Sequence, residues 1–104
     1  AEQDLDRLLI GLKERVEATE GLRPTYFEVM TAMAFQHFRN EGVDVAIVEA
    51  GLGAARDATN ALDATALDLG VVTSIGSEHV EALGGSLESI ARAKAAVFKE
   101  GKVG

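Results

Sequence analysis

A carboxylate and an imidazole each follow a short apolar run in this sequence. Glu49 closes the run VDVAIVEA (43–50), and His79 lies four residues beyond the end of the run GVVTSI (70–75). In a parallel sheet, ligands bind beyond the carboxyl ends of the strands. A separation of about 30 residues is roughly one crossover unit, so the two side chains could meet at one edge. Together they could bind Mg²⁺ or Mn²⁺. The alternative is that Glu49 faces water and His79 lies in the first turn of a helix.

Lys94 is the third residue of chemical interest. On a helical wheel over 86–100 it falls in the middle of an apolar stripe formed by Leu87, Ile90, Ala91 and Phe98. A lysine in that position must extend its amine to water, find a partner, or lose its charge. Extension to water is the usual solution, and the alternative is an amine held near an anion or metal, or chemically modified.

The segment GLGAARDATN (51–60) follows Glu49 directly and contains two glycines. It matches neither the dinucleotide-binding fingerprint nor the GxxxxGK[ST] phosphate loop. We therefore expect a turn that lets other segments approach closely, with Arg56 and Asp57 near whatever Glu49 binds. Elsewhere, Glu28 has capping-box spacing to Thr25, and His37 is expected to be a surface or hydrogen-bonded histidine.

The elements that would position these residues alternate between helix and strand patterns. The apolar runs 43–50 and 70–75 are typical of parallel strands covered on both faces. The remaining patterns predict helices at 2–20, 25–40, 76–85 and 86–100, with a weak helical turn in 61–69. This order predicts an α/β fold with a parallel sheet, two strands and about four helices. The helix at 25–40 is apolar almost all round, so we expect it to be deeply buried.

Composition narrows the class of protein. The 104 residues carry a net charge of −7 and no cysteine. The charge argues against nucleic-acid binding, and no run approaches the roughly 20 apolar residues that span a membrane. No secretory signal is visible. We expect a soluble protein of a reducing compartment such as the cytoplasm.

Four stretches together resemble a known family: PTYFEVMTAMAF (24–35), VDVAIVEAGLGAARDATN (43–60), VVTSIGSEHVEALGGSLESIA (71–91) and KAAVFKEG (94–101). In this order and spacing they resemble the central ATPase domain of folylpolyglutamate synthase and dihydrofolate synthase, in the Mur ligase superfamily. The resemblance implies a Rossmann-like, P-loop NTPase-type three-layer fold. The chain as a whole, residues 1–104, is then expected to be a single partial domain.

The resemblance also implies a chemistry. ATP would phosphorylate a carboxylate of dihydropteroate or folate, and the amine of L-glutamate would displace phosphate from the acyl phosphate. By position, Glu49 would bind magnesium, His79 would contribute to a second magnesium site, and Lys94 would be the lysine that is carboxylated in the family. Carboxylation would turn the cation of the apolar stripe into an anion.

The chain departs from the family pattern in two ways. Ala54 stands where the family usually has a third glycine, and Ala93-Lys94-Ala95-Ala96 replaces the usual EKAG. The phosphate loop, the lid-like loop and the C-terminal domain are not among these residues. The chain is therefore expected to bind no nucleotide and to be inactive alone, packing against other parts of its own domain. Two alternatives stay open: a non-catalytic ligase-like interaction module, and a sister ligase that adds amino acids to cell-wall precursors.

Overall fold

The computed structural model describes residues 2–104, which divide into two compact units with the boundary between Ile47 and Val48. The division falls inside the apolar run 43–50, two residues before Glu49. All three residues singled out for chemistry therefore belong to the second unit.

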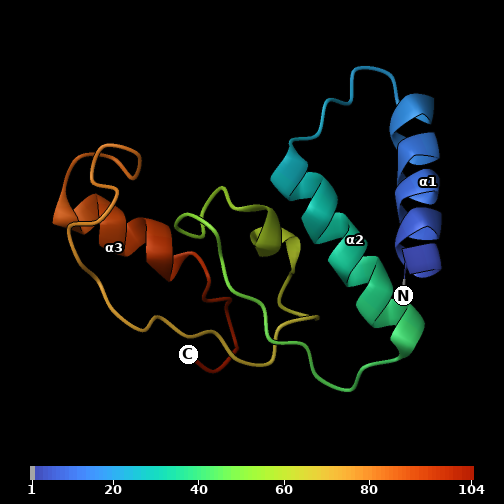
Figure 1. The fold of residues 1–104 in the computed structure, drawn as a ribbon. Coiled ribbons are helices and arrows are strands. Elements are labelled where there is room, and N and C mark those ends of the chain that lie inside the picture. Colours follow the sequence, from blue (N-terminus) through green and yellow to red (C-terminus); the bar gives the residue numbers. More distant parts are fainter. Residues whose placement is uncertain (1) are drawn as a thin grey trace. The chain divides into compact units, whose positions relative to one another are not determined.

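The first unit is a pair of helices, α1 (Glu2–Ala18) and α2 (Tyr26–Glu41), which pack against each other (Figure 1). The predicted capping box begins α2: the Glu28 amide donates to Thr25 Oγ1 at 3.2 Å, and the Thr25 amide donates to Glu28 Oε2 at 2.8 Å. Gly42 ends the helix in the left-handed conformation that glycine adopts without strain. The prediction that Glu28 caps this helix is confirmed.

The packing between α1 and α2 leaves a groove of about 270 Å³. None of the residues predicted to do chemistry lines it. It is lined by Arg7, Leu8, Gly11, Leu12, Arg15, Ala32, Met33, Gln36 and Asn40.

The prediction that α2 is deeply buried is wrong for this structure. Only Thr31 and Met33 of its residues are buried, while Tyr26 keeps 80% of its surface exposed and Phe27 and Met30 are also exposed. A helix that is apolar on all faces needs neighbours on all faces, and within its own unit α2 packs on α1 alone. His37 is exposed, as predicted, with its ring 6.4 Å from that of Phe38.

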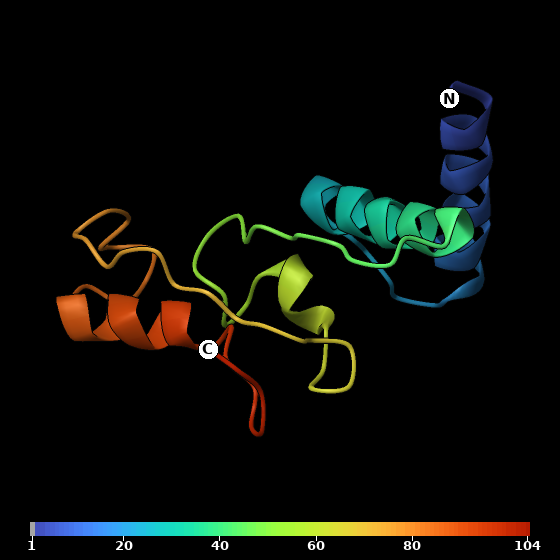
Figure 2. The same ribbon diagram turned by 90° about the horizontal axis from the view of Figure 1, so that it is seen from below.

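The second unit contains a short 3₁₀ helix, η1 (Ala58–Ala61), and the helix α3 (Leu87–Ala95), joined by long irregular segments (Figure 2). Its buried apolar residues are Ala54 and Ile90, and Ile90 is fully enclosed. Ile90 lies on the predicted apolar stripe of α3, whereas Leu87 and Phe98 at the ends of that stripe are exposed. The core of this unit is therefore where the loop after Glu49 meets α3.

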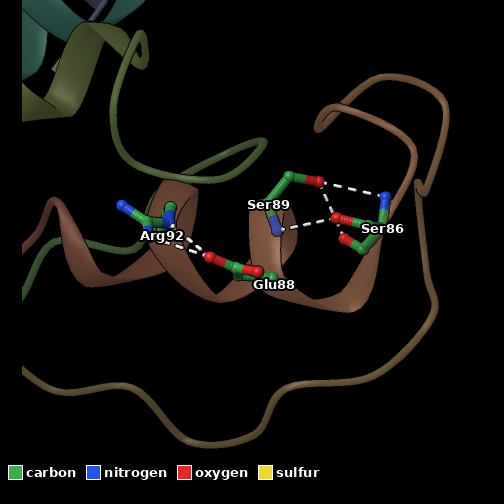
Figure 3. A network of polar contacts seen from close by, with 4 residues as sticks. All are labelled: Ser86, Glu88, Ser89 and Arg92. Atoms are coloured by element: carbon green, nitrogen blue, oxygen red, sulfur yellow. Dashed lines mark hydrogen bonds and ion pairs between the residues drawn. The ribbon is translucent and has the colours of Figure 1, made fainter.

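Reciprocal hydrogen bonds between two serines begin α3 (Figure 3). The Ser89 amide donates to Ser86 Oγ at 3.1 Å, and the Ser86 amide donates to Ser89 Oγ at 3.1 Å. One turn further, Arg92 Nη2 donates to Glu88 Oε1 at 2.8 Å on the exposed face. The predicted cap at Ser86 is confirmed. The helix ends at Ala95, five residues earlier than predicted, and Lys99 lies in the irregular segment beyond it.

The predicted fold class, an α/β three-layer fold with a two-stranded parallel sheet, is contradicted. Residues 2–104 form three α-helices and one 3₁₀ helix and no strand, and their one β-bridge is a single parallel contact of Leu69 with Val103. The runs 43–50 and 70–75 are irregular, and Ile47 is 97% exposed. An extended segment becomes a strand only when a neighbour pairs with its backbone groups. In these two runs, only Gly70 has a backbone hydrogen bond to a distant segment, donating to the Val103 carbonyl at 2.9 Å.

The predicted short helix at 76–85 is also absent from the described residues, which form turns there instead. The Leu83 amide donates to the His79 carbonyl at 3.0 Å, and the Gly85 amide donates to that of Val80. His79 has a φ of 57°, and the φ angles of Gly84 and Gly85 are also positive. Left-handed residues end a helix because they break its repeating dihedral angles.

Within residues 2–104, no helix has the length and apolarity required of a membrane-spanning segment.

We predict that Ser86→Ala will destabilise the first turn of α3 by about 1 kcal/mol, the usual contribution of a serine cap. Amide hydrogen exchange at Ser89 and Ile90 measures this opening free energy. Glu88→Gln is the matched control: it breaks an exposed ion pair worth about 0.5 kcal/mol or less. A larger effect of Glu88→Gln than of Ser86→Ala would contradict the assignment of the cap.

Candidate functional site

Glu49 is exposed at the start of the second unit. Its carboxylate makes no hydrogen bond or ion pair within residues 2–104, and neither does the imidazole of His79, which is also exposed. Both side chains are thus available to a ligand. The structure instead fixes the backbone around them, and it does so through Asp57, Ala93 and Lys94.

Asp57 organises the loop that follows Glu49. One of its carboxylate oxygens accepts from the amides of Gly51 and Leu52, at 2.9 and 3.0 Å. The other accepts from the amide of Thr59 at 3.0 Å and from its hydroxyl. The second set caps η1, and the first holds the chain two residues beyond Glu49. Asp57 thus serves the structure of the loop.

These contacts set the protonation of Asp57. Partial burial raises the pKa of its carboxyl, but the hydrogen bonds from the Thr59 hydroxyl and from the amides of Leu52, Thr59 and Gly51 outweigh it. The net result is a pKa below the ordinary value of 3.8. Asp57 is therefore an acceptor whose oxygens are all engaged, and it is not free to bind a metal.

The same loop is attached to α3 through one carbonyl group. The amides of Ala54 and Ala55 both donate to the Ala93 carbonyl, at 2.9 and 3.1 Å. Gly53 precedes them with a φ of 59°, and a Cβ there would lie 2.9 Å from Leu83 Cδ2. The left-handed φ favours glycine at this position, and a larger residue would also require the Leu83 side chain to move. Ala54, where the resembled family has glycine, is buried in the contact.

Lys94, the residue after Ala93, connects α3 to the other predicted site segment. The residue is half-buried, and its amine donates to the Ser74 carbonyl at 2.9 Å. Ser74 lies near the end of the run 70–75, five residues before His79. Of the alternatives posed by the sequence, the structure gives Lys94 a partner in the backbone.

Sequence reasoning missed one contact of the site. Lys99 donates to Asn60 Oδ1 at 2.7 Å, joining η1 to the segment after α3. No periodicity or motif indicated this pair, because Lys99 was assigned to the helix at 86–100 and the two residues are 39 apart in sequence. Two segments of the second unit thus contact the C-terminal half of α3, and a third contacts the segment that follows it.

The donor atoms present fit a divalent cation only in part. A carboxylate and an imidazole are both metal ligands, and Mg²⁺ commonly keeps several waters beside one or two protein ligands. However, no group of three or more histidine, cysteine or acidic side chains in the described part of the chain could hold a metal ion. A cation bound by Glu49 or His79 would need its remaining ligands from water, substrate or other residues.

Comparison with known proteins agrees with the resemblance seen in the sequence. Residues 9–103 match the Mur ligase middle domain, and the chain belongs to that family. Among its relatives, the dihydrofolate synthase/folylpolyglutamate synthase of Bacillus subtilis (strain 168) is 42% identical over 97% of this chain and 24% of its own length. The Escherichia coli (strain K12) enzyme of the same name is 44% identical over 84% of this chain and 20% of its own.

A solved structure supports the same assignment. A serine-to-alanine mutant of L. casei FPGS superposes with a TM-score of 0.76 and 32% sequence identity, over 88% of this chain and 22% of that one. The backbone therefore follows the course of a Mur ligase middle domain, although the described residues have no sheet. This chain spans about a quarter or less of the relatives named here.

We predict that the loop after Glu49 will lose order in acid. Because the folded pKa of Asp57 is lowered, its stabilising contribution is complete above the ordinary value of 3.8 and is lost as pH falls through the folded pKa. The amide NMR signals of Gly51 and Leu52 should shift with that titration. In Asp57→Asn the acid-dependent shift should disappear, and its persistence would show that another group is responsible.

Proposed function

We propose that these 104 residues are the metal-binding part of an ATP-dependent amide ligase, which adds L-glutamate to dihydropteroate or folate through an acyl phosphate. The proposed activity is that of the relatives, which are dihydrofolate synthase/folylpolyglutamate synthases. The membership of the Mur ligase middle domain family is consistent with it. Within the proposal, residues 1–104 form part of a single domain, and ATP, L-glutamate and the pterin substrate are the partners of the larger site.

One structural observation carries the proposal. Two consecutive residues of α3 contact the segments that hold Glu49 and His79. The Ala93 carbonyl accepts from the loop after Glu49. The Lys94 amine donates to the segment before His79. Glu49 lies five residues before Ala54, whose amide is bound at Ala93, and His79 lies five residues after Ser74. Residues that were selected from the sequence for their chemistry are thus connected to one turn of one helix. This connection of both segments to one helix supports the proposal.

In the proposed site, the free carboxylate of Glu49 would bind one Mg²⁺ and the imidazole of His79 would contribute to a second. Bound magnesium supplies charge neutralisation to a transferring phosphoryl group. The chain's own contribution is to hold both side chains outward from a fixed backbone. The left-handed φ of His79 is of the kind that persists only where the surroundings enforce it.

Lys94 is proposed to act as a carboxylated lysine. In that reaction the neutral amine attacks carbon dioxide, forms an N–C bond and releases a proton, leaving a carbamate anion on the side chain. The amine already lies against the Ser74 carbonyl rather than an acidic partner.

The ligase assignment is tested by ATP-dependent phosphate release in the presence of magnesium, L-glutamate and dihydropteroate. The 104-residue chain should give no turnover above the buffer rate, because no GxxxxGK[ST] loop is among its residues. Robust turnover would overturn the proposal that these residues are only one part of the site.

The metal assignment is tested by Mn²⁺ binding, followed by electron paramagnetic resonance. Glu49→Gln and His79→Asn should each weaken binding by roughly tenfold or more, because each removes a ligand. Glu20→Gln and His37→Asn remove the same kinds of group from exposed positions in the first unit and should leave the affinity unchanged. Equal effects of the site variants and the controls would contradict a defined metal site.

A further inference from the structure

The sequence contains a short near-repeat, DATN at 57–60 and DATA at 63–66. Both copies fold into the same local turn. In each, one oxygen of the aspartate accepts from the amide and the hydroxyl of the threonine two residues later; the amide distances are 3.0 Å at Thr59 and 2.8 Å at Thr65. The local chemistry of Asp57 and Asp63 is therefore the same.

The two copies differ in what they contact beyond the turn. The second oxygen of Asp57 accepts from the amides of Gly51 and Leu52, six and five residues away, whereas Asp63 bonds only to Thr65 and Ala66. The fourth residue also differs, since Asn60 accepts from Lys99 and Ala66 has no side-chain acceptor. Within residues 2–104, only the side chains of the first copy make hydrogen bonds outside their own turn.

We propose that Asp57 is a positioning residue for Glu49. Its second carboxylate oxygen accepts from the amides of Gly51 and Leu52, the two residues after Glu49-Ala50. Asp57 makes no hydrogen bond to Glu49 itself. The inference rests on the proposed metal role of Glu49 and adds a residue that the comparisons do not assign.

The physical need for such a residue lies in the loop itself. Gly51 and Gly53 lie on either side of Leu52, and glycine gives the backbone its greatest conformational freedom. The amides of Ala54 and Ala55 fix the far end of the loop to Ala93. At the near end, the side-chain contacts to Gly51 and Leu52 come from Asp57 alone. Without them the carboxylate of Glu49 would sample many positions, and a metal would have to restrict it on binding.

The test compares Asp57→Ala with Asp63→Ala. The second variant is the control, because it removes the same kind of side chain from the equivalent turn in the other copy. Two readouts are used on the whole chain: hydrogen exchange at the Gly51 and Leu52 amides, and the Kd for Mn²⁺. Asp57→Ala should speed exchange at both amides and weaken Mn²⁺ binding by roughly tenfold, the scale seen for residues that orient metal ligands. Asp63→Ala should change neither. Asp57→Asn keeps one acceptor oxygen and should lie between Asp57→Ala and the unsubstituted protein.

Glu49→Gln separates this inference from the proposed function. If Glu49→Gln leaves the Kd for Mn²⁺ unchanged, the metal role of Glu49 fails, and the positioning role fails with it. If Glu49→Gln weakens binding but Asp57→Ala does not, the positioning role alone is overturned. Equal weakening by Asp57→Ala and Asp63→Ala would also overturn it, because the effect would then be a general loss of turn structure. The Ile90 amide in α3 should stay protected from exchange in all variants, which shows that the unit is folded. If Asp57→Ala loses this protection and Asp57→Asn keeps it, the Kd of Asp57→Asn for Mn²⁺ decides the test.

Discussion

In the second unit, two hydrogen-bond acceptor groups hold the irregular backbone in place. The carboxylate of Asp57 receives three amides and a hydroxyl, and the carbonyl of Ala93 receives two further amides. The loop between Glu49 and η1 has no regular structure of its own, so its peptide groups need such partners. Lys94 adds a bond to the Ser74 carbonyl and Lys99 a bond to Asn60, so the loop after Glu49, the run 70–75 and η1 are all attached to α3 or to the segment after it.

In this arrangement the residues proposed to bind a ligand are exposed. A buried apolar core is small here, consisting of Ala54 and Ile90 in the second unit and Met33 in the first. Polar contacts rather than burial therefore fix the loops, and they leave Glu49 and His79 unpaired at the surface. Side chains held on an ordered backbone but without internal partners are suited to bind a ligand, since binding them costs little conformational entropy.

Much of the local structure was predictable because it depends on residues close together in sequence. The capping residues Thr25, Glu28 and Ser86 act within one turn of a helix, so their types and spacing suffice. The sheet was not predictable in the same way. The runs 43–50 and 70–75 have the composition of buried strands, but a strand also requires a partner, and the described residues provide only the Leu69–Val103 bridge. The burial expected of α2 fails for the same reason.

The sequence by itself determined the helices α1 and α2, the start of α3, the caps at Thr25 and Ser86, and the family to which the chain belongs. It also supplied the side-chain types at Glu49, His79 and Lys94. These follow from side-chain type, periodicity and motif order. The tertiary structure decided which backbone groups those residues meet: Lys94 with the Ser74 carbonyl, Lys99 with Asn60, and Asp57 with Gly51 and Leu52. It also distinguished Asp57 from Asp63, whose local sequences are nearly the same. Contacts of this kind depend on which segments the fold brings together, and the local sequence pattern does not specify that.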